Sequence, residues 1–527
     1  MALDIGRRAF EREVRAAHVD GRPVPTVAIV GGGLSGLATA IQLARSGVRS
    51  FTVLEQSDGV GGTWRDNVYP GAACDVPSHL YSFSFAPKTD WSRRFAEQPE
   101  ILSYAEQCVR RFRLEPHLRL RTTVQRAEFD EESGAWRLTL AGDDGAIETI
   151  GADTVVFACG QLNRPFIPDL AGLDTFRGPS WHSARWDHGY DLTGKQVAVI
   201  GSGASAIQFV PRVAGQCDSL TVFQRSANYV GPKKDRAYSP RARRLFNRVR
   251  VVELAYRWWI YWTLEARWLC FRKDSWAGRK LQEMFTKGIR AEVVSERLPE
   301  SSVVPDYPVG CKRILISNDW YPTLMRPDVT VVDTPVHHIE PDAVVTADGD
   351  RHPAEVLIFG TGFVTTEFLA HIPITGQAGR TLAEEWRDGA RAYLGTAVPG
   401  FPNCYFLYGP NTNLGHNSIL FMVERQVNLI LQALAVQTRT SGGTRTPVVG
   451  VTTEAYERED RRTQELVSRT AWVANCRSWY KNASGRVTNN WPTWTVRYWR
   501  DTLRLRPSDM GLVDSTTQAP LAGRSGA

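Results

Sequence analysis

Two short, mostly apolar runs, each followed by a glycine-rich turn and then by a helix-like pattern, are the most regular features of the chain. Residues 26–30 (TVAIV) lead into GGGLSG and LATAIQLARSG, and residues 196–200 (QVAVI) lead into GSGASAIQFV. A short apolar run bounded by a turn signal is typical of a buried strand. Each segment therefore predicts strand, tight turn and helix, the context in which G-x-G-x-x-G indicates a dinucleotide-binding loop.

Small residues occupy the three motif positions of both loops. They are Gly31, Gly33 and Gly36 in the first loop and Gly201, Gly203 and Ala206 in the second. Alanine is acceptable at the third position because that position only has to let the helix pack closely against the strand. Two complete copies in one chain favour two dinucleotide sites over two unrelated turns.

A charged residue follows each motif at the same distance but with opposite sign. Glu55 comes nineteen residues after Gly36, and Arg225 comes nineteen residues after Ala206. A carboxylate at this point accepts hydrogen bonds from an adenosine ribose and disfavours a 2′-phosphate. A guanidinium binds a 2′-phosphate through two hydrogen bonds. The first site is therefore predicted to take FAD or NAD, and the second to take NADPH.

Two further apolar segments bear on the domain organisation. Residues 153–160 (DTVVFACG) and 355–363 (EVLIFGTGF) each predict a buried strand that ends in a turn of small residues. Such segments are expected where a chain passes between two dinucleotide domains, although two ordinary core strands would look the same. Together they predict an α/β fold with two Rossmann-like dinucleotide-binding domains, in which a discontinuous FAD domain contains an inserted NADP domain.

Composition narrows the classes of partner. The chain has 527 residues, and 43% hydrophobic and 23% charged content is ordinary for a soluble protein. The net charge of +7 is small and the basic residues are scattered, so no nucleic-acid partner is expected. The eight cysteines never occur as C-x-x-C or in a cluster, which argues against a metal site or a redox dithiol. A reducing, cytoplasmic compartment fits this pattern.

No secreted or membrane-spanning segment is expected. The N-terminus, MALDIGRRAFEREV, lacks the apolar core of a secretory signal. No run of about eighteen uncharged apolar residues is found. The nearest is residues 251–271 (VVELAYRWWIYWTLEARWLCF), which contain four charged residues. This segment predicts an amphipathic helix that packs on the protein or lines a pocket, with contact to a membrane surface as the alternative.

Two longer motifs connect the loops to a known family. Residues 176–187 (FRGPSWHSARWD) match F-x-G-x-x-x-H-x-x-x-W-D, and residues 61–75 (GGTWRDNVYPGAACD) match a second pattern of Gly-Gly-x-Trp, Tyr-Pro-Gly and Asp. On these motifs the chain resembles Baeyer-Villiger monooxygenases. The resemblance runs from about residue 25 to about residue 500. It continues through FQRSANYVGPKKDR, YPVGCKR, IFGTGF, AYLGTAVPGFPN, GPNTNLGHNS and SWYKNASGR.

The resemblance implies the cofactors FAD and NADPH, and dioxygen as the oxidant that converts a ketone into an ester or lactone through a C4a-peroxyflavin anion. It implies that Arg313 is the fixed cation beside that anion and that Asp75 orients Arg313. A guanidinium suits this role because it keeps its charge in a protein. The resemblance also places His182, the third residue expected to act in catalysis, and Trp186 on a linker that bends between the two domains during the reaction cycle. The alternative is that His182 only satisfies a buried backbone group.

The family pattern further assigns the cofactor contacts. For FAD they are Thr63, Trp64, Asp75 and Tyr81, and for NADP they are Ser205, Gln208, Arg225, Ser226, Lys312 and Trp479. Val124 and Arg313 complete the expected cofactor contacts. Lys312 is expected at the 2′-phosphate and Trp479 on a mobile loop over NADP. The residues after Trp479 differ from those of the better-known cyclic-ketone enzymes.

The aromatic-rich residues 231–300 correspond to a helical insert of the NADP domain that helps to shape the substrate pocket in the family. The expected boundaries are 1–158 and 364–527 for the FAD domain, 159–230 and 301–363 for the NADP domain, and 231–300 for the insert. The aromatic content suits a large apolar substrate, but core packing explains it equally well.

Two other functions remain open on the sequence. A flavin monooxygenase that oxygenates sulfur or nitrogen would share the double dinucleotide fold. A nucleotide-binding sensor flavoprotein would bind both cofactors without turnover. The Arg313 and Asp75 pair disfavours the sensor, because a sensor needs no fixed cation beside the flavin.

Overall fold

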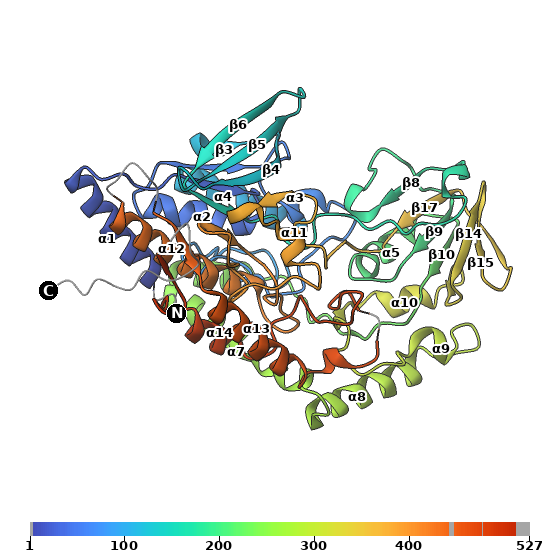
Figure 1. Ribbon diagram of the computed structural model, residues 1–527. Coiled ribbons are helices and arrows are strands. Elements are labelled where there is room, and N and C mark those ends of the chain that lie inside the picture. The colour runs from blue at the N-terminus through green and yellow to red at the C-terminus, as the bar shows by residue number, and fades with distance from the viewer. Residues whose placement is uncertain (1–3, 442–446, 477, 513–527) are drawn as a thin grey trace.

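The first of two parallel sheets is built from both halves of the chain (Figure 1). The computed structural model describes residues 4–441, 447–476 and 478–512. The strand order is β19-β7-β1-β2-β3, and all neighbouring strands are parallel. The strands are β1 (Val27–Val30), β2 (Phe51–Leu54), β3 (Leu118–Arg119), β7 (Thr154–Phe157) and β19 (Cys404–Phe406).

The second parallel sheet has the order β13-β10-β9-β17-β8. Its strands are β8 (Ser180–His182), β9 (Gln196–Ile200), β10 (Ser219–Phe223), β13 (Val329–Val332) and β17 (Val356–Phe359). Strands β1, β7 and β17 are buried along their whole length, because both faces of a parallel sheet are covered. The two sheets confirm the predicted α/β class with two Rossmann-type domains.

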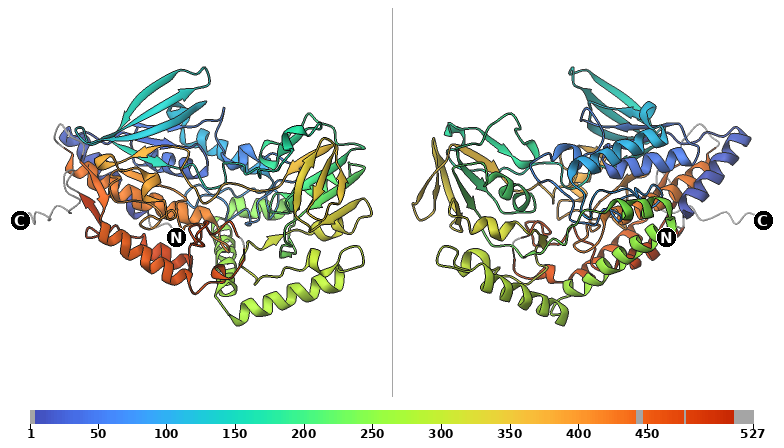
Figure 2. Two further views of the ribbon diagram at one scale, coloured as in Figure 1. Left: turned by 45° about the vertical axis from the view of Figure 1, so that its right-hand side comes forward. Right: turned by 180° about the vertical axis from the view of Figure 1, so that it is seen from behind.

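The chain leaves the first sheet and later returns to it. β19 pairs with β7 through Tyr405 and Val156, and every strand of the second sheet lies between these two strands in sequence. Figure 2 shows the two sheets in separate halves of the molecule. The segments 153–160 and 355–363 contribute β7 and β17, one strand to each sheet. The unit around the first sheet is therefore discontinuous in sequence, and the second sheet is inserted into it.

Helices follow the glycine turns as the sequence pattern predicts. β1 leads into α2 (Leu34–Arg45), and β9 leads into α5 (Ala206–Val213). A run of helices separates β11 (Val230–Gly231) from β12 (Leu315–Ile316), and α8 lies along the lower edge of the molecule in Figure 1. This run consists of α6 (Pro240–Arg248), α7 (Arg250–Glu265), η4 (Ala266–Phe271), α8 (Trp276–Glu292) and α9 (Glu300–Val303).

Two further sheets, one mixed and one antiparallel, were not anticipated from the sequence. One has the order β18-β4-β5-β6 and the other the order β14-β15-β16. The first contains β4 (Thr122–Asp130), β5 (Ala135–Gly142), β6 (Ile147–Ala152) and β18 (Ile374–Thr375). The second contains β14 (Val336–Glu340), β15 (Ala343–Thr346) and β16 (Arg351–Pro353). Along β4, buried Val124 lies between exposed neighbours, which is the alternation of a sheet with one solvated face.

The first helix, α1 (Ile5–Asp20), packs against the long helix α12 (Ile419–Thr440). The backbone N–H of Gly6 donates to Asn428 Oδ1 at 2.8 Å, and a Cβ on Gly6 would lie 2.1 Å from the Asn428 carbonyl oxygen. By length and composition α12 is apolar enough to cross a membrane, but 78% of its apolar window is buried. Among the described residues, α12 is therefore a buried helix of the protein core.

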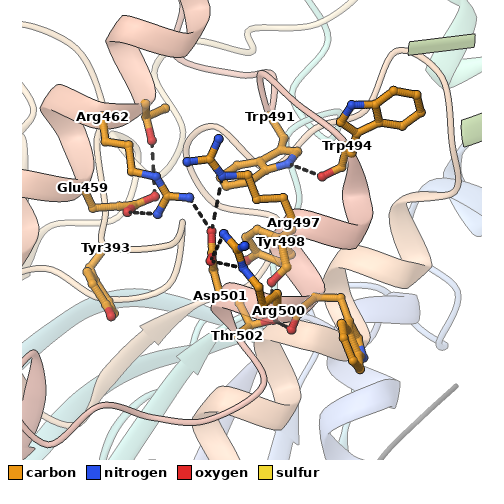
Figure 3. Close-up of polar contacts among 12 residues, drawn as sticks. Tyr393, Glu459, Arg462, Trp491, Trp494, Arg497, Tyr498, Arg500, Asp501 and Thr502 are labelled. Atoms are coloured by element: carbon orange, nitrogen blue, oxygen red, sulfur yellow. Dashed lines mark hydrogen bonds and ion pairs between the residues drawn. The ribbon is translucent and has the colours of Figure 1, made fainter. Parts of the chain in front are cut away.

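A cluster of ion pairs joins helix α13 (Thr453–Val467) to helix α14 (Thr495–Asp501), as Figure 3 shows. Asp501 pairs with Arg462 of α13 and with Arg497 and Arg500 of its own helix. The Asp501 side chain is only 5% exposed, so these pairs are partly shielded from screening by water. The cluster fixes both ends of the segment that carries Trp479.

Candidate active site

The two glycine loops have the backbone geometry that close approach of a dinucleotide requires. Gly31 and Gly201 have φ of +109° and +103°, a backbone conformation that residues other than glycine rarely adopt. A Cβ on Gly36 would lie 1.9 Å from the carbonyl oxygen of Gly31, so only glycine allows α2 to pack this closely. In the second loop Ala206 occupies the matching position with a methyl group.

Hydrogen bonds within the protein hold the predicted FAD contacts that lie around the first glycine loop. Glu55 accepts from the backbone N–H of Gly32 at 2.6 Å and of Ser57 at 2.8 Å, and only 6% of Glu55 is exposed. Trp64 Nε1 donates to the Tyr81 hydroxyl at 3.1 Å. Glu55 is therefore an anchor of the glycine loop as well as a candidate ribose contact.

Both loops open into one cavity of about 960 Å³. Most of the predicted site residues line this cavity: Gly31, Gly33, Glu55, Thr63, Trp64, Asp75, Tyr81, Val124, Gly201, Gly203, Ser205, Gln208, Arg225, Ser226, Lys312, Arg313 and Trp479. Gly36, Ala206 and His182 are not part of its lining. Gly36 and Ala206 lie behind the loops at the contacts between helix and strand, as expected for residues that let the helix pack closely against the strand.

An ion pair on the cavity wall links residues far apart in sequence. Arg313 Nη2 donates to Asp75 Oδ2. The charge of Asp75 raises the pKa of Arg313 above its ordinary value and outweighs the opposing effect of burial. Tyr408 and Tyr480 also line the cavity and lie close enough to influence this pKa. Neither tyrosine was found by the sequence analysis, because no motif position marked them.

The long motif of residues 61–75 forms the contact between the two dinucleotide units. The Tyr69 hydroxyl donates to Gln208 Oε1 of α5 at 2.9 Å, and Gln208 Nε2 donates to the Ala73 carbonyl at 3.0 Å. Gly71 has φ of +82°, and a Cβ there would lie 2.8 Å from the Gln208 carbonyl oxygen. Gln208 thus connects the two units in addition to lining the cavity.

Two cations lie close together at the second loop without a carboxylate partner among the described residues. Lys312 Nζ donates to the Ser226 hydroxyl and lies 4.3 Å from the centroid of the Tyr307 ring. Burial lowers the pKa of Lys312 and the charge of Arg225 lowers it further, and the charge of Asp306 offsets this lowering only in part. A bound anion would relieve this repulsion, which fits the predicted 2′-phosphate.

The short motif of residues 176–187 contains an edge strand of the second parallel sheet. Residues Ser180–His182 form β8, which pairs in parallel with β17. A Cβ on Gly178 would lie 2.0 Å from the Glu355 carbonyl oxygen, so glycine lets the segment approach the sheet. This pairing, which a local motif does not reveal, fixes the segment.

His182 reaches the cavity only indirectly. It is 2% exposed, and burial lowers its pKa. Its Nδ1 accepts from the backbone N–H of Ala184 at 3.1 Å, and its ring meets Phe363 edge-on at a centroid distance of 5.5 Å. Phe363 lines the cavity, so His182 supports the cavity wall from behind.

A disulfide that the sequence did not indicate lies next to residues of the cavity wall. Cys311 and Cys476 are bonded although 165 residues separate them, and the six other cysteines are free. The bond ties the segment of Lys312 and Arg313 to the segment of Trp479. Pairing between distant segments leaves no spacing motif in the sequence, so this bond could not be predicted from cysteine spacing.

The site residues fit two dinucleotide cofactors. Glycines occupy the places where a Cβ would obstruct the turns, two cations at the second loop form no ion pair within the described residues, and both loops share one cavity with a fixed cation. Fold and site together define an oxidoreductase with two dinucleotide-binding sites.

Comparison with known proteins places the chain more narrowly. The family model described as flavin-binding monooxygenase-like matches residues 25–371. A Baeyer-Villiger monooxygenase of Streptomyces coelicolor is 41% identical over 511 residues, which cover 95% of this chain and 96% of that protein. The chain belongs to the flavin-binding monooxygenase-like family, and the resemblance to Baeyer-Villiger monooxygenases seen in the sequence is confirmed.

Solved structures agree with this placement. An oxidized steroid monooxygenase bound to NADP is 31% identical, with a TM-score of 0.80, and the match covers 93% of this chain and 99% of that one. OTEMO in complex with FAD and NADP is 26% identical, with a TM-score of 0.81, and the match covers 93% of this chain and 100% of that one.

Proposed function

We propose that the protein is an FAD-dependent Baeyer-Villiger monooxygenase that uses NADPH and dioxygen to convert a ketone into an ester or lactone. The observation that carries this proposal is the Arg313 and Asp75 ion pair on the wall of a cavity shared by both glycine loops. In the overall reaction one oxygen atom enters the bond beside the carbonyl carbon, the other leaves as water, and NADPH supplies two electrons. When bound, FAD supplies the redox step between NADPH and dioxygen.

The residues of the chain divide between the two cofactors in this proposal. The first loop holds FAD, with Glu55 as a ribose contact and Trp64 on the cavity wall. The second loop holds NADPH, with Arg225 and Lys312 at the 2′-phosphate. The order of the strands supports an FAD domain of residues 1–158 and 364–527 and an NADP domain of 159–230 and 301–363, with an insert at 231–300.

Arg313 supplies a fixed positive charge where an oxygen anion has to be held. A guanidinium carries five N–H donors. Its hydrogen bond to Asp75 uses one of them, and no other hydrogen bond from Arg313 is formed within the described residues. A cation fixed in advance in a site shielded from bulk water stabilises developing negative charge more than a mobile one. Asp75 orients this cation, and the remaining donors stay available for the anion.

A panel of linear, aromatic, cyclic and polycyclic ketones tests the proposed activity. We expect at least one ketone to accelerate NADPH oxidation and to give ester or lactone in proportion. Formation of sulfoxide or N-oxide without any ester would favour a heteroatom oxygenase. No sustained NADPH oxidation with any substrate would favour a nucleotide-binding sensor.

We also propose that the protein works in the cytoplasm. Six of its cysteines are free, which suits a reducing compartment. The Cys311–Cys476 bond is the exception, and its presence in cells is measured directly by trapping free thiols during lysis.

Replacing Arg225 by alanine is expected to raise the KM for NADPH about tenfold, the scale of one hydrogen bond to a charged group. The KM for NADH should stay nearly unchanged, because NADH lacks the 2′-phosphate. Steady-state kinetics with both cofactors measure this difference, and NADH is the internal control. Equal use of NADPH and NADH by the unaltered protein would contradict the proposed phosphate site.

Replacing His182 by alanine is expected to slow flavin reduction while FAD stays bound. The reason is that the ring supports Phe363 on the cavity wall without contacting the cavity itself. Stopped-flow reduction by NADPH, together with the thermal midpoint of unfolding, separates positioning from stability. A lowered midpoint with an unchanged reduction rate would show that His182 is purely structural.

A further inference from the structure

The outward side of α7 is an uncharged stripe. Val251, Ala255, Trp259 and Trp262 recur every three or four residues and therefore share one side of the helix. The exposed fractions are 69% for Val251, 54% for Trp259 and 50% for Trp262. Thr263 is also exposed and extends the same side. We call these five residues the α7 stripe.

The opposite side of α7 is firmly docked on the protein. Glu265 is fully buried and accepts from the backbone N–H of Thr495 at 2.6 Å and from Asn417 Nδ2 at 2.7 Å. Arg257 Nη1 donates to the His79 carbonyl oxygen at 2.6 Å. These contacts fix the rotation of the helix about its axis, so the α7 stripe faces outward in the folded protein.

Exposed apolar side chains are concentrated in this region. Eight of the fifteen exposed large apolar side chains in the described part of the chain fall within residues 245–284. They are Leu245, Val249, Val251, Trp259, Trp262, Leu269, Trp276 and Met284. Five of the eight, Leu245 to Trp262, lie on α6, on α7 or at the residue between them, and these two helices contact each other. Scattered single exposures need no explanation, whereas such a group indicates an interaction surface.

The same region is strongly basic. Residues 241–290 contain thirteen lysines and arginines but only four acidic residues, and two of these acids, Glu253 and Glu265, are fully buried. The arginines of α6 and the first residue of α7 are exposed and form no ion pair within the described residues. They are Arg241, Arg243, Arg244, Arg248 and Arg250. The region that contains the α7 stripe therefore carries an excess of positive charge.

We propose that the α7 stripe and the arginines of α6 dock the protein on the surface of an anionic lipid bilayer. Tryptophan favours the interface between headgroups and acyl chains, and arginine is attracted to anionic headgroups. A helix with an apolar side and a basic flank lies in the plane of such an interface. A second copy of the chain fits this surface less well, because its own basic flank would oppose the first.

The docking surface lies on the same helical segment that forms part of the cavity wall. Leu264 and Arg267, at the end of α7 and the start of η4, line the cavity. Docking would bring this helical wall of the cavity close to the bilayer, where apolar compounds dissolve. The docking itself does not depend on the proposed oxygenation.

Vesicle flotation of the full chain loaded with FAD and NADP⁺ tests the proposal. The vesicles contain either phosphatidylcholine alone or phosphatidylcholine mixed with phosphatidylglycerol. We expect binding to the anionic vesicles, weak binding to the neutral ones, and release by high salt. The Trp259→Ser/Trp262→Ser variant and the Arg244→Glu/Arg248→Glu variant should each lower the partition coefficient about tenfold or more.

Ile147→Ser is the matched control, because Ile147 is 67% exposed on β6 and lies outside the region. Its binding should equal that of the unaltered protein. Should the double tryptophan variant fail to fold, Ala255→Glu adds a charge to the stripe without removing any packing. No binding to anionic vesicles would overturn the proposal, as would equal binding by the folded stripe variants. A concentration-dependent dimer that is lost in the stripe variants, without vesicle binding, would assign the surface to a second copy.

Discussion

Replacing Arg313 by alanine is expected to abolish ester or lactone formation while NADPH oxidation continues in part. The guanidinium is the cation that Asp75 orients on the cavity wall, and loss of such a fixed charge costs about three to four kcal/mol of barrier, or several hundredfold in rate. Hydride transfer from NADPH to FAD depends mainly on contact between the two cofactors, so it should continue in part without the charge of Arg313. Electrons should therefore leave as hydrogen peroxide, and assays of ester, NADPH and hydrogen peroxide in one reaction measure the partition.

Two variants sharpen this result. Asp75→Asn keeps the side-chain shape but removes the charge that raises the pKa of Arg313, so it should lower ester formation less than Arg313→Ala. Arg225→Ala is the control, because it removes a cation from the same cavity without touching the ion pair. At saturating NADPH it should form ester at a nearly normal rate. Normal ester yield from Arg313→Ala would refute the assignment of this residue.

Replacing Gly36 by alanine is expected to give a protein that retains little FAD. The added Cβ would lie 1.9 Å from the Gly31 carbonyl oxygen, so α2 would have to move away from β1 and disturb the first loop. Overpacking of this kind lowers the free energy of unfolding by about 1–3 kcal/mol. The flavin-to-protein absorbance ratio and the denaturant midpoint measure the two effects.

The second loop supplies the matched control. Ala206 occupies the position that corresponds to Gly36 and already carries a methyl group. The reverse change, Ala206→Gly, should leave both FAD content and NADPH binding close to those of the unaltered protein. A Gly36→Ala protein with a full complement of FAD would show that the first loop adjusts more easily than its contacts indicate.

The candidate site was predictable in part because its loops are local structures. Gly31 and Gly201 mark tight turns, and Glu55 and Arg225 follow them at fixed spacing. The contact between Arg313 and Asp75 could not be predicted from a local pattern. It followed from resemblance to a family, since no local rule joins residues this far apart in sequence.

Other features escaped the sequence because they are made by contacts between distant segments. The Cys311–Cys476 bond and the cavity-lining Tyr480 have no spacing signal. The meander of β4, β5 and β6 is different, because its strands are consecutive and β5 alternates, with Trp136, Leu138 and Leu140 buried. A local pattern of period two was therefore present in the sequence and was overlooked.

By itself, the sequence determined the two strand–turn–helix units and the opposite charges that follow them. Hydrophobic period, glycine sterics and charge sign act over a few residues, so they can be read locally. Only the tertiary structure decided that β19 returns to the first sheet, that β8 pairs at the edge of the second sheet, and that the α7 stripe faces outward. These outcomes depend on which segments pack together after the chain has folded, because burial and strand pairing are properties of the assembled molecule.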